Sequence, residues 1–127
     1  MNDQQYQEHG TELFREFAAE LNQRTETMDG ADSLRELALS FVQTGKTTAD
    51  IYTEGPNLVS RLFTTYPDFA PGFPRELLWF LAGDCLHFMP DDEIELFQRM
   101  EEMRTDAGAR GELFDFQAAR AKLLKLQ

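Results

Sequence analysis

The segment PRELLWFLAGDCLHFM, from Pro74 to Met89, most constrains what this chain can fold into. From Leu77 onward, Asp84 and His87 are the only two strongly ionisable side chains in a run of apolar residues. A helix that is apolar on all sides is normally buried at the centre of its domain. We therefore predict a buried central helix over about residues 74–89. Because burying a polar group without a partner is costly, Asp84 and His87 should form either a structural pair or a functional site.

The size and charge of the chain limit the classes of protein to which it can belong. Its 127 residues suit a single domain over 1–127, and 11 Phe, 3 Tyr and 1 Trp can fill a core without a disulfide or a metal. Its 12 basic and 23 acidic residues give a net charge of −11. This balance argues against nucleic-acid binding and against adhesion to an anionic membrane, since both need clustered Lys and Arg.

Three features predict a cytoplasmic protein. The N-terminal stretch MNDQQYQEHG is polar, so we expect no secretory signal peptide. The longest strongly apolar run, Leu77–Gly83, is far shorter than the roughly 20 residues that a membrane-spanning helix needs. Cys85 is the one cysteine, which excludes an intrachain disulfide and suits a reducing compartment.

Apolar residues recur at helical spacing through the rest of the chain, and no stretch alternates convincingly as a β-strand does. Breaks at Met28–Gly30, Gly45 and Gly108–Gly111 divide this pattern. We expect an all-α fold, a bundle of about five to seven helices around the central one. The expected helices cover about residues 3–24, 34–42, 48–66, 74–89, 91–103 and 116–126, with an irregular loop over Pro67–Phe73.

Local signals predict how several of these helices begin. Ser33 followed by Glu36 is a capping-box pattern. The Thr47-Thr48 pair supplies a cap for the third helix, and Gly55-Pro56 should interrupt that helix as a kink or as a new start. Asp115 is expected to cap the last helix.

Asp84 and His87 are three residues apart, so a continuous helix would present them on the same side. In one interpretation they line an internal cavity with Cys85 and Trp79, and His87 acts as a general base or ligand oriented by Asp84. In the other they are a mutually satisfied polar pair that cross-links neighbouring helices. Cys85 and His87 lie about 200° apart around a helix and cannot form a catalytic dyad within it.

No motif for a cofactor or a metal survives inspection, so we expect neither. Thr44–Thr47 resembles the end of a phosphate-binding loop, but Ser40 stands where that loop needs glycine, and no strand precedes it. No glycine-rich dinucleotide fingerprint occurs. With His9 and His87 as the only histidines and one cysteine, neither a di-iron bundle nor a zinc site has its ligands.

An acidic set follows the central helix and could form a docking face for a basic partner. Asp92, Glu95, Glu101 and Glu102 are its main candidates, with Asp91, Glu93 and Asp106 beside them and Arg99 and Arg104 interspersed. The ordinary explanation is a solvated helix face whose first acidic residues favour the positive end of the helix dipole.

Two further segments could contact partners. The loop Tyr66–Phe73 places three aromatic residues among prolines, and such a loop either covers the core or binds a partner. The amphipathic segment Leu113–Gln127 either packs back on the core as a last helix or detaches to fill a groove in a partner.

From about Leu58 to Leu126 the chain resembles a family of small uncharacterised proteobacterial proteins, some of which carry an automatic dehydrogenase label. The resemblance rests on Arg61-Leu62, Tyr66-Pro67, Pro74–Phe80, Gly83–Asp91 and Phe114–Phe116. It implies a soluble helical protein and no particular activity. This sequence lacks the glycine turn and the strands that a dehydrogenase would need.

The leading function predicted from the sequence is a non-catalytic cytoplasmic protein-interaction or regulatory module, with homo-oligomers possible. The alternative is a small-molecule- or metal-binding protein that uses a cavity at Asp84 and His87.

Overall fold

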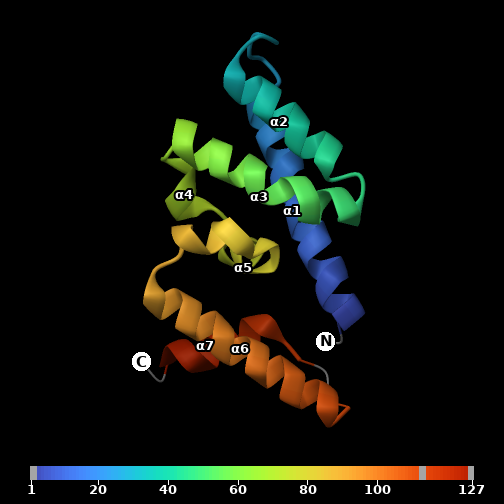
Figure 1. Cartoon of the computed structure of the whole chain (residues 1–127), viewed down its shortest axis with the longest axis vertical. Helices are drawn as coiled ribbons and strands as arrows, with labels where there is room; N and C mark the ends of the chain where they lie inside the picture. Colours follow the sequence, from blue (N-terminus) through green and yellow to red (C-terminus); the bar gives the residue numbers. More distant parts are fainter. Residues whose placement is uncertain (1–2, 112–113, 126–127) are drawn as a thin grey trace.

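The structure is a computed structural model that describes residues 3–111 and 114–125, without the side chains of Asp84, Phe116, Gln117 and Lys125. Within these ranges its regular secondary structure is entirely helical, which confirms the predicted all-α fold (Figure 1). The elements are α1 (Asp3–Thr25), α2 (Ser33–Thr44), α3 (Thr48–Thr65), α4 (Phe69–Gly72), α5 (Arg75–Leu81), the 3₁₀-helix η1 (Gly83–Phe88), α6 (Asp91–Ala109) and α7 (Phe116–Lys125).

The helices stack in three levels. Figure 1 shows α1 and α2 packed beside each other with α3 crossing them, α5 and η1 in the middle, and α6 with α7 below. The long α1 reaches from α2 down towards α6, so it contacts elements that are far apart in the sequence. Among the described residues, no helix is both long enough and apolar enough to cross a lipid bilayer.

A row of aromatic rings runs through the core and joins the upper helices to the middle level. Phe17 of α1 contacts Phe41 of α2 at 5.4 Å between ring centroids and Phe73 at 4.6 Å. Phe73 contacts Phe63 of α3 at 5.2 Å, and Phe63 contacts Phe88 of η1 at 4.8 Å. All four contacts are edge-on, the geometry that the ring quadrupole favours.

The predicted continuous helix over 74–89 is wrong in one respect: it is split into α5 and η1. The split lies at Ala82 and Gly83, which both have φ 55°, and a positive φ cannot continue a right-handed helix. Both halves still supply buried residues, with Leu77 and Cys85 fully inaccessible. The burial of this segment is therefore confirmed, whereas its continuity is not.

Of the two outcomes predicted at Gly55-Pro56, the new helix start is wrong, because α3 runs through both residues. Gly55 is buried, and a side chain there would meet Leu81 at 3.0 Å and Phe14 at 3.3 Å, so the glycine permits close packing rather than a break. The turn before Pro56 is exposed. Water can therefore bind the Tyr52 carbonyl that loses its helical partner at Pro56.

The helix ends follow the predictions in part. Asp32, not Ser33, caps α2, accepting a hydrogen bond from the Leu34 N–H at 2.9 Å. Thr47 caps α3, and the side chain of Asp115 accepts from the N–H of Ala118 at 3.2 Å at the start of α7. The expected loop over Pro67–Phe73 contains one helical turn, α4. The predicted contribution of Leu126 to the last helix lies outside the described residues.

Candidate functional site

Of the four residues predicted for an internal cavity, the structure describes the side chains of three, Trp79, Cys85 and His87. Cys85 is fully buried, whereas His87 lies on the exposed side of η1, so the expectation that His87 is buried is wrong. Trp79 belongs to α5 and lies half-buried against α6. The pairing of Asp84 with His87 stays a prediction, because the side chain of Asp84 is not described.

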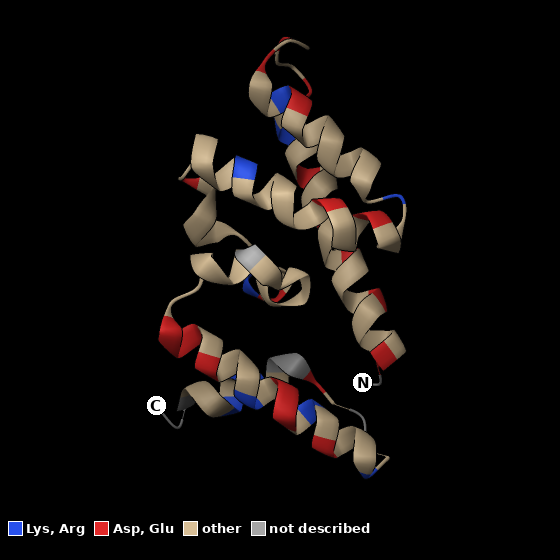
Figure 2. Cartoon of the chain, viewed as in Figure 1, with Lys and Arg blue, Asp and Glu red and all other residues tan. Residues whose placement is uncertain are grey.

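The predicted acidic face lies along the outer side of α6. At 100° per residue, Glu95, Glu102 and Asp106 share one stripe of the helix, opposite the buried Phe97 and Met100. Asp92 is exposed at the edge of this stripe, and Glu101 is half-buried at its other edge. Figure 2 shows acidic residues at the start of α6 and again further along it.

Part of this acidic face adjoins Trp79 and forms an open groove of about 570 Å³, which we call the Trp79 groove. The Trp79 indole is stacked on Phe97 with 5.8 Å between ring centroids and 27° between ring planes, which holds the indole in place. The six residues that line the groove include three carboxylates and no basic side chain: Trp79, Gln98, Glu101, Glu102, Thr105 and Asp106.

An arginine underneath the groove anchors it to α1. Arg104 is 9% exposed, forms an ion pair of 2.7 Å with Asp3 and a second one with Glu101, and lies 4.6 Å from the centre of the Tyr6 ring. Arg104 therefore lies among the acidic residues in the sequence but does not share their exposed side of α6. Burial, followed by the nearby Glu101 carboxylate, raises the pKa of Tyr6 above its usual range.

A hydrogen-bonded pair of polar side chains beside Trp79 joins two residues that could not be connected from the sequence. His9 Nε2 lies 2.8 Å from Glu76 Oε2, and the two residues are 67 positions apart. They border a cavity of about 10 Å³, which holds one water molecule at most. The pair joins α1 to α5, and the enclosed space beside it is too small for a substrate.

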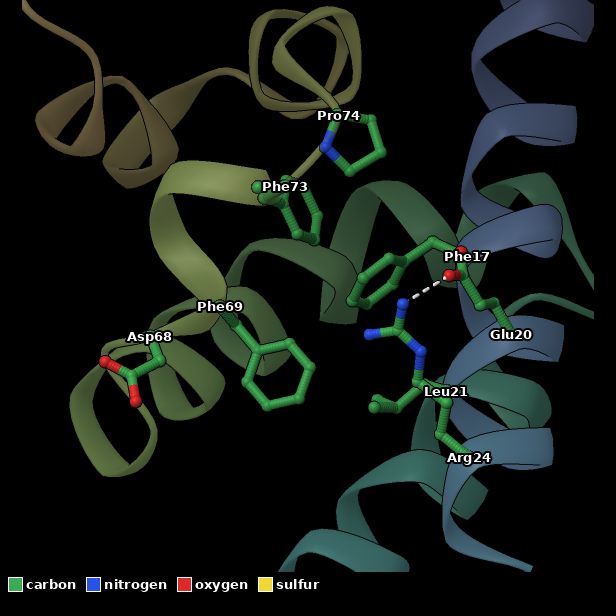
Figure 3. Close-up of a pocket in the computed structure, with 9 residues that line it drawn as sticks. Phe17, Glu20, Leu21, Arg24, Asp68, Phe69, Phe73 and Pro74 are labelled. Carbon is green, nitrogen blue, oxygen red and sulfur yellow. Dashed lines mark hydrogen bonds and ion pairs between the residues drawn. The ribbon is translucent and has the colours of Figure 1, made fainter.

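The structure also contains a pocket that the sequence analysis did not find, which we call the aromatic pocket (Figure 3). It encloses about 220 Å³ between α1 and the segment that carries α4. Buried side chains form its floor, half-buried rings and a proline form its walls, and charged side chains and a glycine lie at its mouth. The floor consists of Leu21 and Phe73. The walls consist of Phe17, Phe69 and Pro74. The residues at the mouth are Glu20, Arg24, Asp68 and Gly72.

The charged groups at the mouth of the aromatic pocket are arranged unevenly. Arg24 extends from α1 towards Phe69 and forms an ion pair of 2.8 Å with Glu20 (Figure 3). The Asp68 carboxylate points away from the pocket (Figure 3). Phe69 and Phe73 come from the loop in which the sequence analysis noted aromatic residues, but nothing local in the sequence connects that loop with α1.

Among the side chains that the structure describes, no three His, Cys, Asp or Glu residues lie close enough to share a metal ion.

A family model described as PA2817-like matches residues 2–127, which includes the N-terminal half that lies outside the resemblance noted over 58–126. No curated protein and no solved structure matches the chain.

Proposed function

Because the chain belongs to the PA2817-like family, whose description names no activity, we propose a function from the geometry. The protein is a non-catalytic interaction module of the cytoplasm, and it binds a basic segment of a partner protein in the Trp79 groove. A regulatory role would follow from the occupancy of this groove.

The observation that carries the proposal is the position of the indole among carboxylates. Trp79 is half-buried beside Glu102 and Asp106, which are exposed, and beside Glu101, whose carboxylate already pairs with the buried Arg104. The indole attracts a Lys or Arg side chain over its face, an interaction worth about 0.5–1 kcal/mol at an exposed site. Carboxylates on the same wall can pair with further cations of the segment, each contributing about 0.2–1 kcal/mol.

The charge of the whole protein supports the same partner chemistry. A net charge of −11 attracts basic segments from a distance and speeds their association. The contacts in the groove then select where the segment binds. Because these contacts are mainly electrostatic and exposed, we expect moderate affinity that weakens as salt is added.

Trp79 is the only tryptophan, so its fluorescence reports on the groove directly. We would titrate the protein with a hexa-arginine peptide and, as the opposite charge, with a hexa-glutamate peptide. The proposal predicts a saturable change in Trp79 emission with hexa-arginine alone, and a dissociation constant that rises with salt. No change with hexa-arginine, or the same change with both peptides, would overturn it.

Two double variants separate the groove from the overall charge. Glu102→Lys with Asp106→Lys alters the groove, whereas Glu8→Lys with Glu12→Lys alters exposed positions of α1. Each reversal adds two charges, so both variants carry −7 instead of −11. Binding should be lost in the groove variant and retained in the α1 variant. Equal weakening in both would mean that charge alone, and no specific groove, attracts the peptide.

A further inference from the structure

We infer that the aromatic pocket binds a small organic acid, a molecule with one ring-sized apolar body and one carboxylate that pairs with Arg24. This site lies between α1 and α4, away from the Trp79 groove, and the inference does not depend on the proposed function. It assigns to a different part of the molecule the small-molecule binding that the sequence analysis had considered at Asp84 and His87.

The apolar part of the ligand follows from the floor and walls. Leu21 and Phe73 are each 1% exposed, and the half-buried rings of Phe17 and Phe69 rise on either side. The floor and walls are apolar, the charged side chains lie at the mouth, and the space between them measures about 220 Å³. Pockets for drug-sized ligands measure about 300–1,000 Å³, so this one suits a single ring with a short chain.

The rings that form the pocket are already held in position. Phe73 contacts Phe17 at 4.6 Å and Phe63 at 5.2 Å between centroids, so its orientation is fixed from two sides. Phe69 contacts Tyr66 at 6.5 Å. A ligand therefore binds to a largely formed site. It does not pay the loss of affinity that ordering these side chains would cause.

The charge of the ligand follows from Arg24. Its guanidinium carries five N–H donors, and its one interaction among the described residues is the ion pair that a terminal nitrogen makes with Glu20. The side chains of Arg24 and Glu20 are 64% and 59% exposed, and an ion pair so exposed contributes little to stability. The remaining N–H groups of Arg24 can therefore donate to a second carboxylate. A cationic ligand would first have to displace Arg24, and Asp68 is turned away from the space where it would bind (Figure 3).

Three probes with the same body test this assignment: 3-phenylpropionate, 3-phenylpropanamide and 3-phenylpropylamine, titrated into the full chain and followed by NMR. The acid should bind with a dissociation constant on the order of 1 mM, as expected for so small a ligand. The amide should bind about five- to tenfold more weakly, because it lacks the charge-assisted bond. The perturbed resonances should include those of Phe17, Phe69 and Phe73.

Variants at the mouth identify the residue that reads the charge. Arg24→Gln should lower the affinity for the acid to that for the amide and leave the affinity for the amide unchanged. Glu20→Gln should raise the affinity for the acid, because it removes a competing carboxylate. Phe69→Ala should weaken both ligands, and Arg61→Gln, at an exposed position of α3 outside the pocket, should change neither.

The inference is overturned by any of three results: no binding of the acid, binding of the amine at least as tight as that of the acid, or an Arg24→Gln variant that binds the acid as well as the wild type does. The inference would also be overturned if the acid perturbed resonances of residues outside the aromatic pocket and left those of Phe17, Phe69 and Phe73 unchanged.

Discussion

Replacing Gly10 by alanine tests how closely α1 packs on α5. A Cβ built on Gly10 would lie 2.2 Å from Cδ1, 2.3 Å from Cγ and 2.4 Å from Cε1 of Phe80. Carbon atoms in contact are normally about 3.5–4.0 Å apart, so the ring would have to move by more than about 1 Å. Phe80 is 5% exposed and its ring contacts those of Tyr6 and Tyr52, which leaves it little room to move.

Two opposing effects set the size of the change. Alanine is favoured over glycine inside a helix by about 1 kcal/mol. Overpacking a core costs about 1–3 kcal/mol, and we take the upper value because the new methyl group overlaps three ring atoms of Phe80. The net loss in free energy of unfolding is then about 2 kcal/mol. For a chain of this length the melting temperature should fall by about 6–10 °C.

Urea denaturation of two matched variants measures this loss. Gly108 lies inside α6, and an added Cβ there meets no heavy atom of the described residues within 4 Å. Gly108→Ala should therefore be neutral or stabilise by up to about 1 kcal/mol, whereas Gly10→Ala should destabilise. In a Phe80→Leu background the cost of Gly10→Ala should shrink, since the two residues are in contact. A Gly10→Ala variant that is as stable as the wild type, or a cost that is the same in both backgrounds, would contradict close packing of α1 on Phe80.

Three further predictions concern single side chains. Arg75 forms a largely buried ion pair of 2.6 Å with Glu93 and donates hydrogen bonds to two backbone carbonyls. Arg75→Gln should therefore lower the free energy of unfolding, measured by urea denaturation, by about 2–4 kcal/mol. A loss below about 0.5 kcal/mol would contradict this. The pKa of Tyr6 is higher in the folded state than in the unfolded one, so its contribution to stability is present below about pH 10 and lost as the pH rises further. Urea denaturation between about pH 9 and about pH 11 should therefore show a smaller loss of stability for Tyr6→Phe than for the wild type, and parallel curves would argue against it. His87→Ala should change the free energy of unfolding by less than about 0.5 kcal/mol, because the side chain is exposed, and a larger loss would point to a buried partner.

The sequence predicts which residues are buried better than it predicts where the backbone turns. The apolar run after Pro74 correctly indicates that Leu77 and Cys85 are buried, since burial follows from composition alone. The split after Leu81 has one local signal, Gly83, but that signal is ambiguous, because an isolated glycine also occurs inside a helix, as Gly55 does in α3. Ala82 is a good helix former, and its positive φ is imposed by the packing of η1 against α3 and α5 rather than by its own preference.

The candidate sites show the same division between local and distant information. The exposure of Glu95 and Glu102 follows from helical periodicity within one segment. The Trp79 groove and the aromatic pocket could not be predicted, because each combines residues from separate elements. Trp79 of α5 and the groove residues of α6 are separated in the sequence by η1. Phe17 of α1 and Phe69 of α4 are separated by α2 and α3.

The central claim, that a basic segment of a partner binds the Trp79 groove, is tested most directly by photo-crosslinking in cells of the source organism. A benzophenone amino acid would replace Thr105 in the groove or, as the control, Thr53 on α3; both are exposed threonines whose hydroxyls donate to the carbonyl four residues before them. We predict crosslinks from position 105 to peptides rich in Lys and Arg, absent at position 53 and lost when Glu102 and Asp106 are both replaced by lysine. The same products from both positions, or crosslinked peptides without basic residues, would contradict the claim.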